Sequence, residues 1–132
     1  MVSKVILAKI RGINMDKNCA VYSASNLVGK RWTIVILLEL YKGEGSWKRY
    51  SHIKSKLPQL TPKILSTRLK ELEKEGIILK KVDSTVMPIK SEYSLTKRGE
   101  EFIDIIRQLK AWSLKNKENK TCKAKDCKKC EL

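Results

Sequence analysis

The apolar residues of this chain recur mostly at helical spacing, and the clearest case is a helix expected over residues 61–75. Its inward face is a stripe of leucines three or four residues apart, namely Leu65, Leu69 and Leu72. Thr61 can cap the start of this helix, and Pro62 suits the first helical position, where the N–H that proline lacks would have no partner. Gly76 then supplies the end of the helix.

The same periodicity predicts four other helices, over residues 17–27, 30–43, 46–58 and 96–116. The second of these is apolar nearly all round, which indicates a helix buried in the core. The third is expected to open with Lys48, Arg49 and Tyr50, and Thr96 can cap the last. Residues 2–13 suit either a helix or a strand.

Two short apolar runs predict a β hairpin rather than helices. IILKKV (residues 77–82) and SEYSL (residues 91–95) read as strands, and DSTVMPIK between them reads as a loop. Two helices joined by a tight turn and followed by a hairpin are typical of a winged helix-turn-helix. The expected fold is therefore mainly α with a small β hairpin.

The length of 132 residues favours one compact domain. We expect the winged helix-turn-helix domain over residues 18–118, with a C-terminal dimerisation helix at its end. An N-terminal extension over residues 1–17 precedes it, and a basic cysteine-containing tail over residues 119–132 follows it. A partner subunit would help so short a chain to bury apolar surface.

The chain is strongly basic, with 29 Lys and Arg against 14 Asp and Glu, a formal net charge of +15 and a pI of about 9.8. Such a surface attracts polyanions, and nucleic acid is the first candidate. A membrane is the competing polyanion, but no basic amphipathic helix, lipidation signal, secretory signal or membrane span is evident in the sequence. We expect a cytoplasmic protein that binds double-stranded DNA and no membrane.

The second helix of a helix-turn-helix reads base edges in the major groove, so residues 61–75 are the expected recognition helix. The wing, residues 80–92, would lie on the backbone or in the minor groove. The candidate DNA-binding side chains combine hydroxyls that bond to bases with cations that hold phosphates. They are Lys48, Arg49, Tyr50, Thr61, Pro62, Lys63, Ser66, Thr67, Lys70, Lys81 and Lys90.

Several fragments occur together and in order. Cys19 is followed thirteen residues later by Trp32 in GKRW, and then come PQLTPKILSTRLKELEKEG, MPIKSEYSLTKRG and Trp112. In these residues the chain resembles the HxlR family of winged helix-turn-helix regulators, within the MarR-like superfamily, over about residues 19–113. Ala20 departs from the family pattern, which usually has proline there.

The resemblance implies a homodimeric transcription regulator whose terminal helices form the dimer interface. The stripe on the last helix fits this role, although packing within one chain could account for part of it. Its residues are Phe102, Ile105, Ile106, Leu109 and Trp112. The resemblance also places Arg68 in a structural ion pair with a glutamate such as Glu71 or Glu75.

The cysteines are candidates for thiol chemistry. Some members of the family sense oxidants or electrophiles through the cysteine that Cys19 resembles, whereas a small buried apolar role is the alternative for this thiol. Cys122, Cys127 and Cys130 have the spacing C-x4-C-x2-C, which a fourth thiolate would complete into a zinc or iron–sulfur site. A disulfide and a reduced tail are the alternatives, and no cofactor is expected unless these cysteines bind metal.

Catalysis is not expected. His52 is the sole histidine, and neither a glycine-rich phosphate loop nor paired carboxylates in an apolar setting appear in the sequence. The closer alternatives are a non-specific DNA or chromatin-type binder and a metal-binding winged-helix protein. No pattern in the sequence indicates an effector.

Overall fold

The structure is a computed structural model that describes residues 18–43 and 45–115. The chain divides between Thr33 and Ile34 into two units, each described by itself below. The N-terminal extension and the cysteine tail expected from the sequence lie outside the described residues. The domain boundaries at residues 18 and 118 therefore remain predictions. Nowhere in the described ranges is a helix long and apolar enough to cross a membrane.

The first unit carries helix α2 (Ala20–Val28), close to the range predicted for it. Cys19 is its N-cap residue and Gly29 its C-cap residue. Trp32 then adopts a φ of 79°, a left-handed conformation that a residue with a Cβ rarely takes. The guanidinium of Arg31 lies over the Trp32 ring, 4.8 Å from its centroid.

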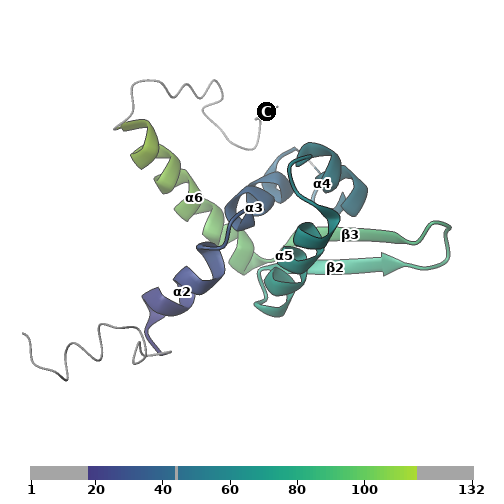
Figure 1. Cartoon of the computed structure of the whole chain (residues 1–132), viewed down its shortest axis with the longest axis horizontal. Helices are drawn as coiled ribbons and strands as arrows, with labels where there is room; N and C mark the ends of the chain where they lie inside the picture. The colour runs from purple at the N-terminus through teal and green to yellow at the C-terminus, as the bar shows by residue number, and fades with distance from the viewer. Residues whose placement is uncertain (1–17, 44, 116–132) are drawn as a thin grey trace, which may run out of the picture. The chain divides into compact units, whose positions relative to one another are not determined.

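The second unit has the winged helix-turn-helix order of elements (Figure 1). Its elements are α3 (Thr33–Tyr41, beginning at the unit boundary), β1 (Lys48–Arg49), α4 (Tyr50–Lys56), α5 (Pro62–Lys74), β2 (Ile78–Asp83), β3 (Lys90–Leu95) and α6 (Lys97–Lys115). The strands form one antiparallel sheet in the order β1-β3-β2. Its β2–β3 hairpin is the wing.

The core of the second unit is built from the positions that the helical periodicity marks. Fully buried side chains come from α3, α4, α5 and α6, from the first residue of β2 and from the turn between α4 and α5. They include Ile36, Leu37, Ile53, Leu60, Leu65, Leu69, Leu72, Ile78 and Ile103. The prediction of a core helix over residues 30–43 is therefore confirmed in α3, apart from Val35, which is exposed.

Helix α5 begins and ends as its local sequence predicts. The Thr61 hydroxyl accepts a hydrogen bond from the backbone N–H of Ile64 at 3.2 Å, and Pro62 is the first helical residue. Gly76 follows the last turn with a φ of 72°, which suits glycine because it has no Cβ. The N–H of Ile77 donates to the carbonyl of Leu72 at 3.0 Å, and both side chains are buried, which completes the C-terminal cap.

The prediction that Lys48 and Arg49 open a helix is wrong. They form strand β1, where Lys48 pairs with Tyr93 and Arg49 with Glu92, and α4 starts at Tyr50. Pairing with β3 supplies the backbone hydrogen-bond partners that Lys48 and Arg49 cannot supply for each other. The wing is therefore the central strand β3 and the edge strand β2 of a three-stranded sheet and not an isolated hairpin.

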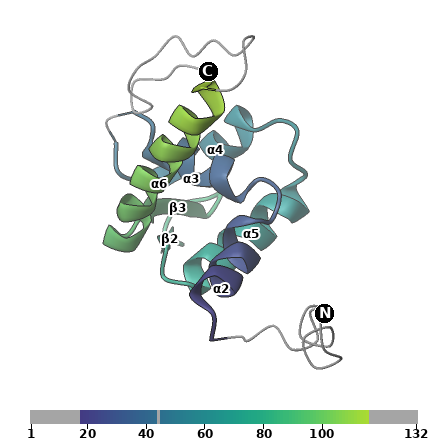
Figure 2. The same ribbon diagram turned by 90° about the vertical axis from the view of Figure 1, so that its left-hand side faces the viewer.

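Helix α6 begins against the end of α5. Thr96 caps α6 by accepting from the Gly99 N–H at 3.1 Å, and its Oγ1 also lies 2.7 Å from the carbonyl oxygen of Gly76. Arg98 donates to the Glu75 carbonyl at 2.7 Å. From there α6 runs past α3 (Figure 2). Arg107 on α6 donates to the hydroxyl of Tyr41 on α3.

The apolar stripe on α6 faces two directions. Ile106 is buried in the core of its own chain and Phe102 is half-buried, so assigning Ile106 to a dimer interface is wrong. Ile105, Leu109 and Trp112 are exposed. One helix turns its two faces to different surroundings because adjacent residues lie about 100° apart around the axis.

Candidate nucleic-acid interface

The outward face of α5 carries the side chains that the sequence assigns to base reading. Leu65, Leu69 and Leu72 lie in the core, which leaves Lys63, Thr67 and Lys70 exposed on the opposite face of the helix. The leucine stripe predicts that Lys63, Ser66, Thr67 and Lys70 point outward; this is confirmed for all but Ser66, which is half-buried. Two ammonium groups and one hydroxyl therefore project from the same side of the helix.

The N-terminal end of α5 is also open to solvent. Thr61 and Pro62 are both exposed, and the first turn of a helix carries N–H groups without helical partners. The Thr61 hydroxyl satisfies the N–H of Ile64. The positive end of the helix dipole and the remaining N–H groups suit a phosphate.

Tyr50 and Ser66, both candidates from the sequence, lie together between α4 and α5. The Tyr50 hydroxyl donates to the Pro62 carbonyl at 3.3 Å, and its oxygen is 3.5 Å from Ser66 Oγ. Both side chains are half-buried. Tyr50 thus holds the first turns of α5 against α4.

The hydroxyl of Thr67 is turned back along its own helix. It donates to the Lys63 carbonyl at 2.8 Å, four residues earlier. Its single hydrogen is therefore engaged in this bond, and the lone pairs of the oxygen remain to accept one. The predicted ion pair of Arg68 is present with Glu71 at 3.5 Å and not with Glu75.

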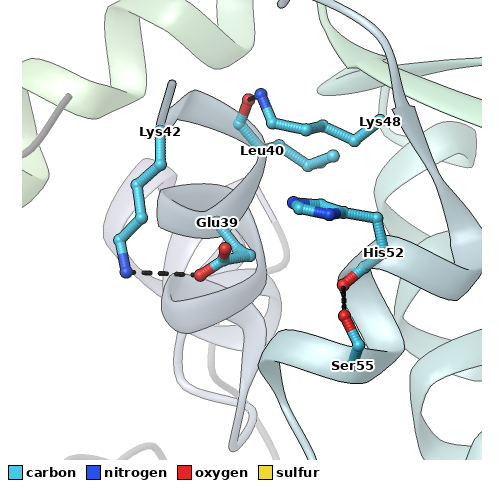
Figure 3. A network of polar contacts seen from close by, with 6 residues as sticks. All are labelled: Glu39, Leu40, Lys42, Lys48, His52 and Ser55. Carbon is cyan, nitrogen blue, oxygen red and sulfur yellow. Dashed lines mark hydrogen bonds and ion pairs between the residues drawn. The ribbon is translucent and has the colours of Figure 1, made fainter. Parts of the chain in front are cut away.

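Lys48 is placed differently from the phosphate contact expected of it. Its ammonium donates to the Gly45 carbonyl at 2.7 Å, beyond the end of α3. It also donates to the Leu40 carbonyl at 3.4 Å, in the last turn of α3 (Figure 3). The imidazole of His52 points toward the same helix, beside Leu40 and Glu39. Glu39 is buried and pairs with Lys42 at 3.2 Å. Lys48 therefore ties β1 to α3.

The wing lysines meet on one carboxylate that the sequence reasoning missed. Glu92 Oε1 lies 2.7 Å from Lys90 Nζ, and Oε2 lies 3.3 Å from Lys81 Nζ. The hydrogen bond from Lys90, assisted by Lys81, holds the pKa of Glu92 below its ordinary value, although partial desolvation opposes it. In the sheet, Glu92 on β3 lies opposite Lys81 on β2 and opposite Arg49 on β1. This placement of one acidic residue between two basic ones would have indicated the ion pair, had β1 been recognised in the sequence.

Trp47 is a second residue that the sequence reasoning missed. The ammonium of Lys81 lies 4.5 Å from the centroid of the Trp47 ring, within the range of a cation–π contact. The ring and Glu92 together fix where Lys81 lies on the wing.

The cysteines are only partly placed. Cys19 is exposed at the start of α2, so the alternative of a small buried apolar residue is wrong. Cys122, Cys127 and Cys130 lie outside the described residues. Within the described ranges no group of three His, Cys, Asp or Glu side chains is arranged to hold a metal ion.

Comparison with known proteins agrees with this geometry. The model of the HxlR-like helix-turn-helix family matches residues 27–121. The chain belongs to this family. Its members are DNA-binding transcription regulators with a winged helix-turn-helix, and this chain shares that fold.

Three relatives of this HxlR-like chain illustrate the likeness. The HTH-type transcriptional regulator YvaP of Bacillus subtilis is 34% identical over 102 residues, covering 76% of this chain and 91% of YvaP. The reduced form of the regulator YodB from B. subtilis superposes with a TM-score of 0.64 at 28% identity, covering 92% of this chain and all of YodB. The redox regulator HypR in its oxidised form superposes with a TM-score of 0.64 at 30% identity, covering 76% of this chain and 99% of HypR.

Proposed function

We propose that this HxlR-like regulator binds double-stranded DNA sequence-specifically, with α5 in the major groove and the wing on the backbone or in the minor groove. The observation that carries the proposal is the division of α5 into a fully buried leucine face and an exposed face with Lys63, Thr67 and Lys70. Such a regulator would act in the cytoplasm, where it meets DNA.

The chemistry of the exposed face suggests which base groups it would read. Lysine donates to the O6 and N7 acceptors of guanine. Because the Thr67 hydrogen is engaged by the Lys63 carbonyl, its oxygen would accept from an amino group, such as adenine N6 or cytosine N4. A correct contact of this kind discriminates against a wrong base by roughly 1–3 kcal/mol.

The experiment begins with selection of bound duplexes from a random pool, followed by titration of the selected duplex and a scrambled one. We expect Lys63→Ala and Thr67→Ala to reduce the ratio of specific to non-specific affinity. Lys74→Ala is the matched control, because Lys74 is exposed in the last turn of the same helix. Lys81→Ala should weaken all sequences alike.

A non-specific DNA binder is the second candidate, and the high positive charge supports it. It makes a different prediction for the same titration. If Lys63→Ala and Thr67→Ala lower the affinity for both duplexes equally, the protein binds through charge alone and the assignment of base-reading residues is wrong.

We propose further that the protein is a homodimer through α6. Ile105, Leu109 and Trp112 are exposed at helical spacing along α6, and a contiguous exposed apolar face indicates a surface that a partner covers. Phe102 would lie at the edge of the interface. Leu109→Asp should convert a dimer to a monomer in analytical ultracentrifugation. Gln108→Asp, at the adjacent exposed position, is the control.

Thiol regulation is proposed through Cys19. The thiol is exposed at the N-terminal end of α2, where an oxidant or electrophile can reach it. HypR, by name a redox regulator, and YodB, with a solved quinone-bound structure, support this proposal. Diamide or a quinone should change DNA affinity in the wild type and not in Cys19→Ser; equal responses would contradict it.

The tail cysteines carry a separate proposal. Cys122, Cys127 and Cys130 would bind zinc or an iron–sulfur cluster with a fourth thiolate, form a disulfide, or stay reduced. Metal analysis of protein purified without oxygen, with Cys127→Ser as the control, distinguishes these. Absence of stoichiometric zinc or iron eliminates the metal site, and thiol counting under oxidising conditions then tests the disulfide.

A further inference from the structure

The tip of the wing exposes a contiguous group of apolar side chains. Residues 84–89 join β2 to β3, and Val86 is 41% exposed, Met87 87% and Ile89 58%. Pro88 between them is exposed as well. In Figure 1 this loop lies beyond the ends of both strands, at the far end of the hairpin.

The loop is held where it leaves the sheet. Asp83 Oδ1 accepts hydrogen bonds from the N–H of Thr85 at 3.0 Å and from its hydroxyl at 2.5 Å, which lowers the pKa of Asp83. Asp83 also pairs with Lys90 across the sheet, at the last rung of the ladder. Each strand has six residues, so the tip stands about 20 Å from the base of the hairpin.

Single exposed apolar residues are ordinary on protein surfaces, but a contiguous group indicates a surface that is covered by a partner. The charge of the adjoining sheet indicates which kind of partner. Strands β1, β2 and β3 carry five cationic side chains (Lys48, Arg49, Lys80, Lys81 and Lys90) and two anionic ones (Asp83 and Glu92). A basic stem suits the phosphates of a nucleic acid, and an apolar tip suits its stacked bases.

We propose that the tip is a wedge that enters the minor groove of DNA, with Met87 and Ile89 inserted at a base step. The proposal rests on the proposed function, because α5 in the major groove would bring the hairpin that follows it to the neighbouring minor groove. Methionine, isoleucine and proline serve as such wedges in minor-groove proteins, where they partly unstack a step and bend the duplex by about 20–90°. Pyrimidine–purine steps, which unstack most easily, are the preferred sites.

The test is DNA bending measured by energy transfer between dyes at the two ends of a selected duplex. The full chain is compared with Met87→Ala/Ile89→Ala and with Met87→Leu, which keeps an apolar side chain of similar size. Leu79→Ala is the matched control, because Leu79 is a similarly exposed apolar residue at the other end of β2. Circular dichroism of each variant checks that the fold is kept.

The wild type, Leu79→Ala and Met87→Leu should bend the duplex, whereas the double alanine variant should bind it with the bend lost. Equal bending by the double variant, or specific binding by the wild type without bending, would overturn the wedge and leave the proposed function standing. Failure of the wild type to select any duplex would instead overturn the proposed function. A change of oligomeric state in the double variant, with bending kept, would show that the tip is a protein interface and also overturn the wedge.

Discussion

The hydroxyl of Tyr50 joins the two helices of the helix-turn-helix, because it donates to the Pro62 carbonyl and lies within hydrogen-bonding distance of Ser66 Oγ. Tyr50 is the first residue of α4, and Pro62 and Ser66 belong to the first two turns of α5. These are the turns that would approach the bases. A side chain that the sequence assigns to DNA therefore also positions the proposed recognition helix.

Tyr50→Phe should weaken specific DNA binding without abolishing folding. One hydrogen bond of this kind contributes about 0.5–1.5 kcal/mol, which corresponds to a loss of a few-fold to about tenfold in affinity if it is expressed in binding. Fluorescence anisotropy on the selected duplex measures it. Ser66→Ala and the double variant complete a cycle; additive effects would show that the two hydroxyls act independently.

Gly99→Ala should destabilise the fold. A Cβ at this position would overlap the carbonyl oxygen of Ile77, which is backbone and cannot swing away, and would lie 3.1 Å from Leu95 Cδ2. Overpacking of this kind costs about 1–3 kcal/mol in the free energy of unfolding, measured by urea denaturation. Gly45→Ala is the control, because its Cβ would meet no atom closer than 3.9 Å. Equal stability of the two variants would contradict the close approach of α6 to the end of α5.

Thr96→Val should destabilise the protein by about 0.5–2 kcal/mol, the usual cost of losing an N-cap hydroxyl. The variant loses the bond to the Gly99 N–H and the contact with the Gly76 carbonyl while keeping nearly the same volume. Thr96→Ser retains the hydroxyl and should restore most of the loss in thermal or urea unfolding. A serine variant as unstable as the valine variant would argue against the cap.

The pKa of Glu92 should rise when Lys90 is removed. In the native protein the hydrogen bond from Lys90 lowers this pKa from the ordinary value of 4.5. A carboxyl whose folded-state pKa is lowered contributes stability above its unfolded pKa, and that stability is lost as the pH falls through the folded-state value. An NMR titration of the Glu92 carboxyl carbon in the wild type and in Lys90→Ala measures the shift. An unchanged pKa would show that the ion pair does not form in solution.

Three of the lysines predicted to contact DNA have partners within the protein itself. Lys48 donates to the carbonyl of Leu40 in the last turn of α3 and to that of Gly45 after it, and Lys81 and Lys90 share Glu92. Each of these three ammonium groups therefore has a partner within the protein. Sequence reasoning identified basic residues near the recognition helix. It could not say which of them the fold itself would engage, because Lys81 meets Glu92 only through the pairing of β2 with β3, and Lys48 meets the Leu40 carbonyl only once the chain has folded.

The sequence by itself determined the elements whose signals are local. The start of α5 at Pro62, its cap at Thr61 and its end before Gly76 depend on bonds that span three to five residues, and the leucine stripe determines which face is buried. The cap of α6 at Thr96 is local in the same way. Local hydrogen bonds form with little loss of chain entropy, which is why a short sequence motif suffices to specify them.

Only the tertiary structure decided the features whose partners lie far along the chain. Strand β1 is two residues long and exists because β3, more than forty residues later, supplies its hydrogen-bond partners. The burial of Ile106 beside the exposure of Ile105 depends on where α6 meets the core, and the placement of Lys81 depends on Glu92 and Trp47. Periodicity marks an apolar stripe, but the packing of the folded chain determines which part of that stripe remains for a partner.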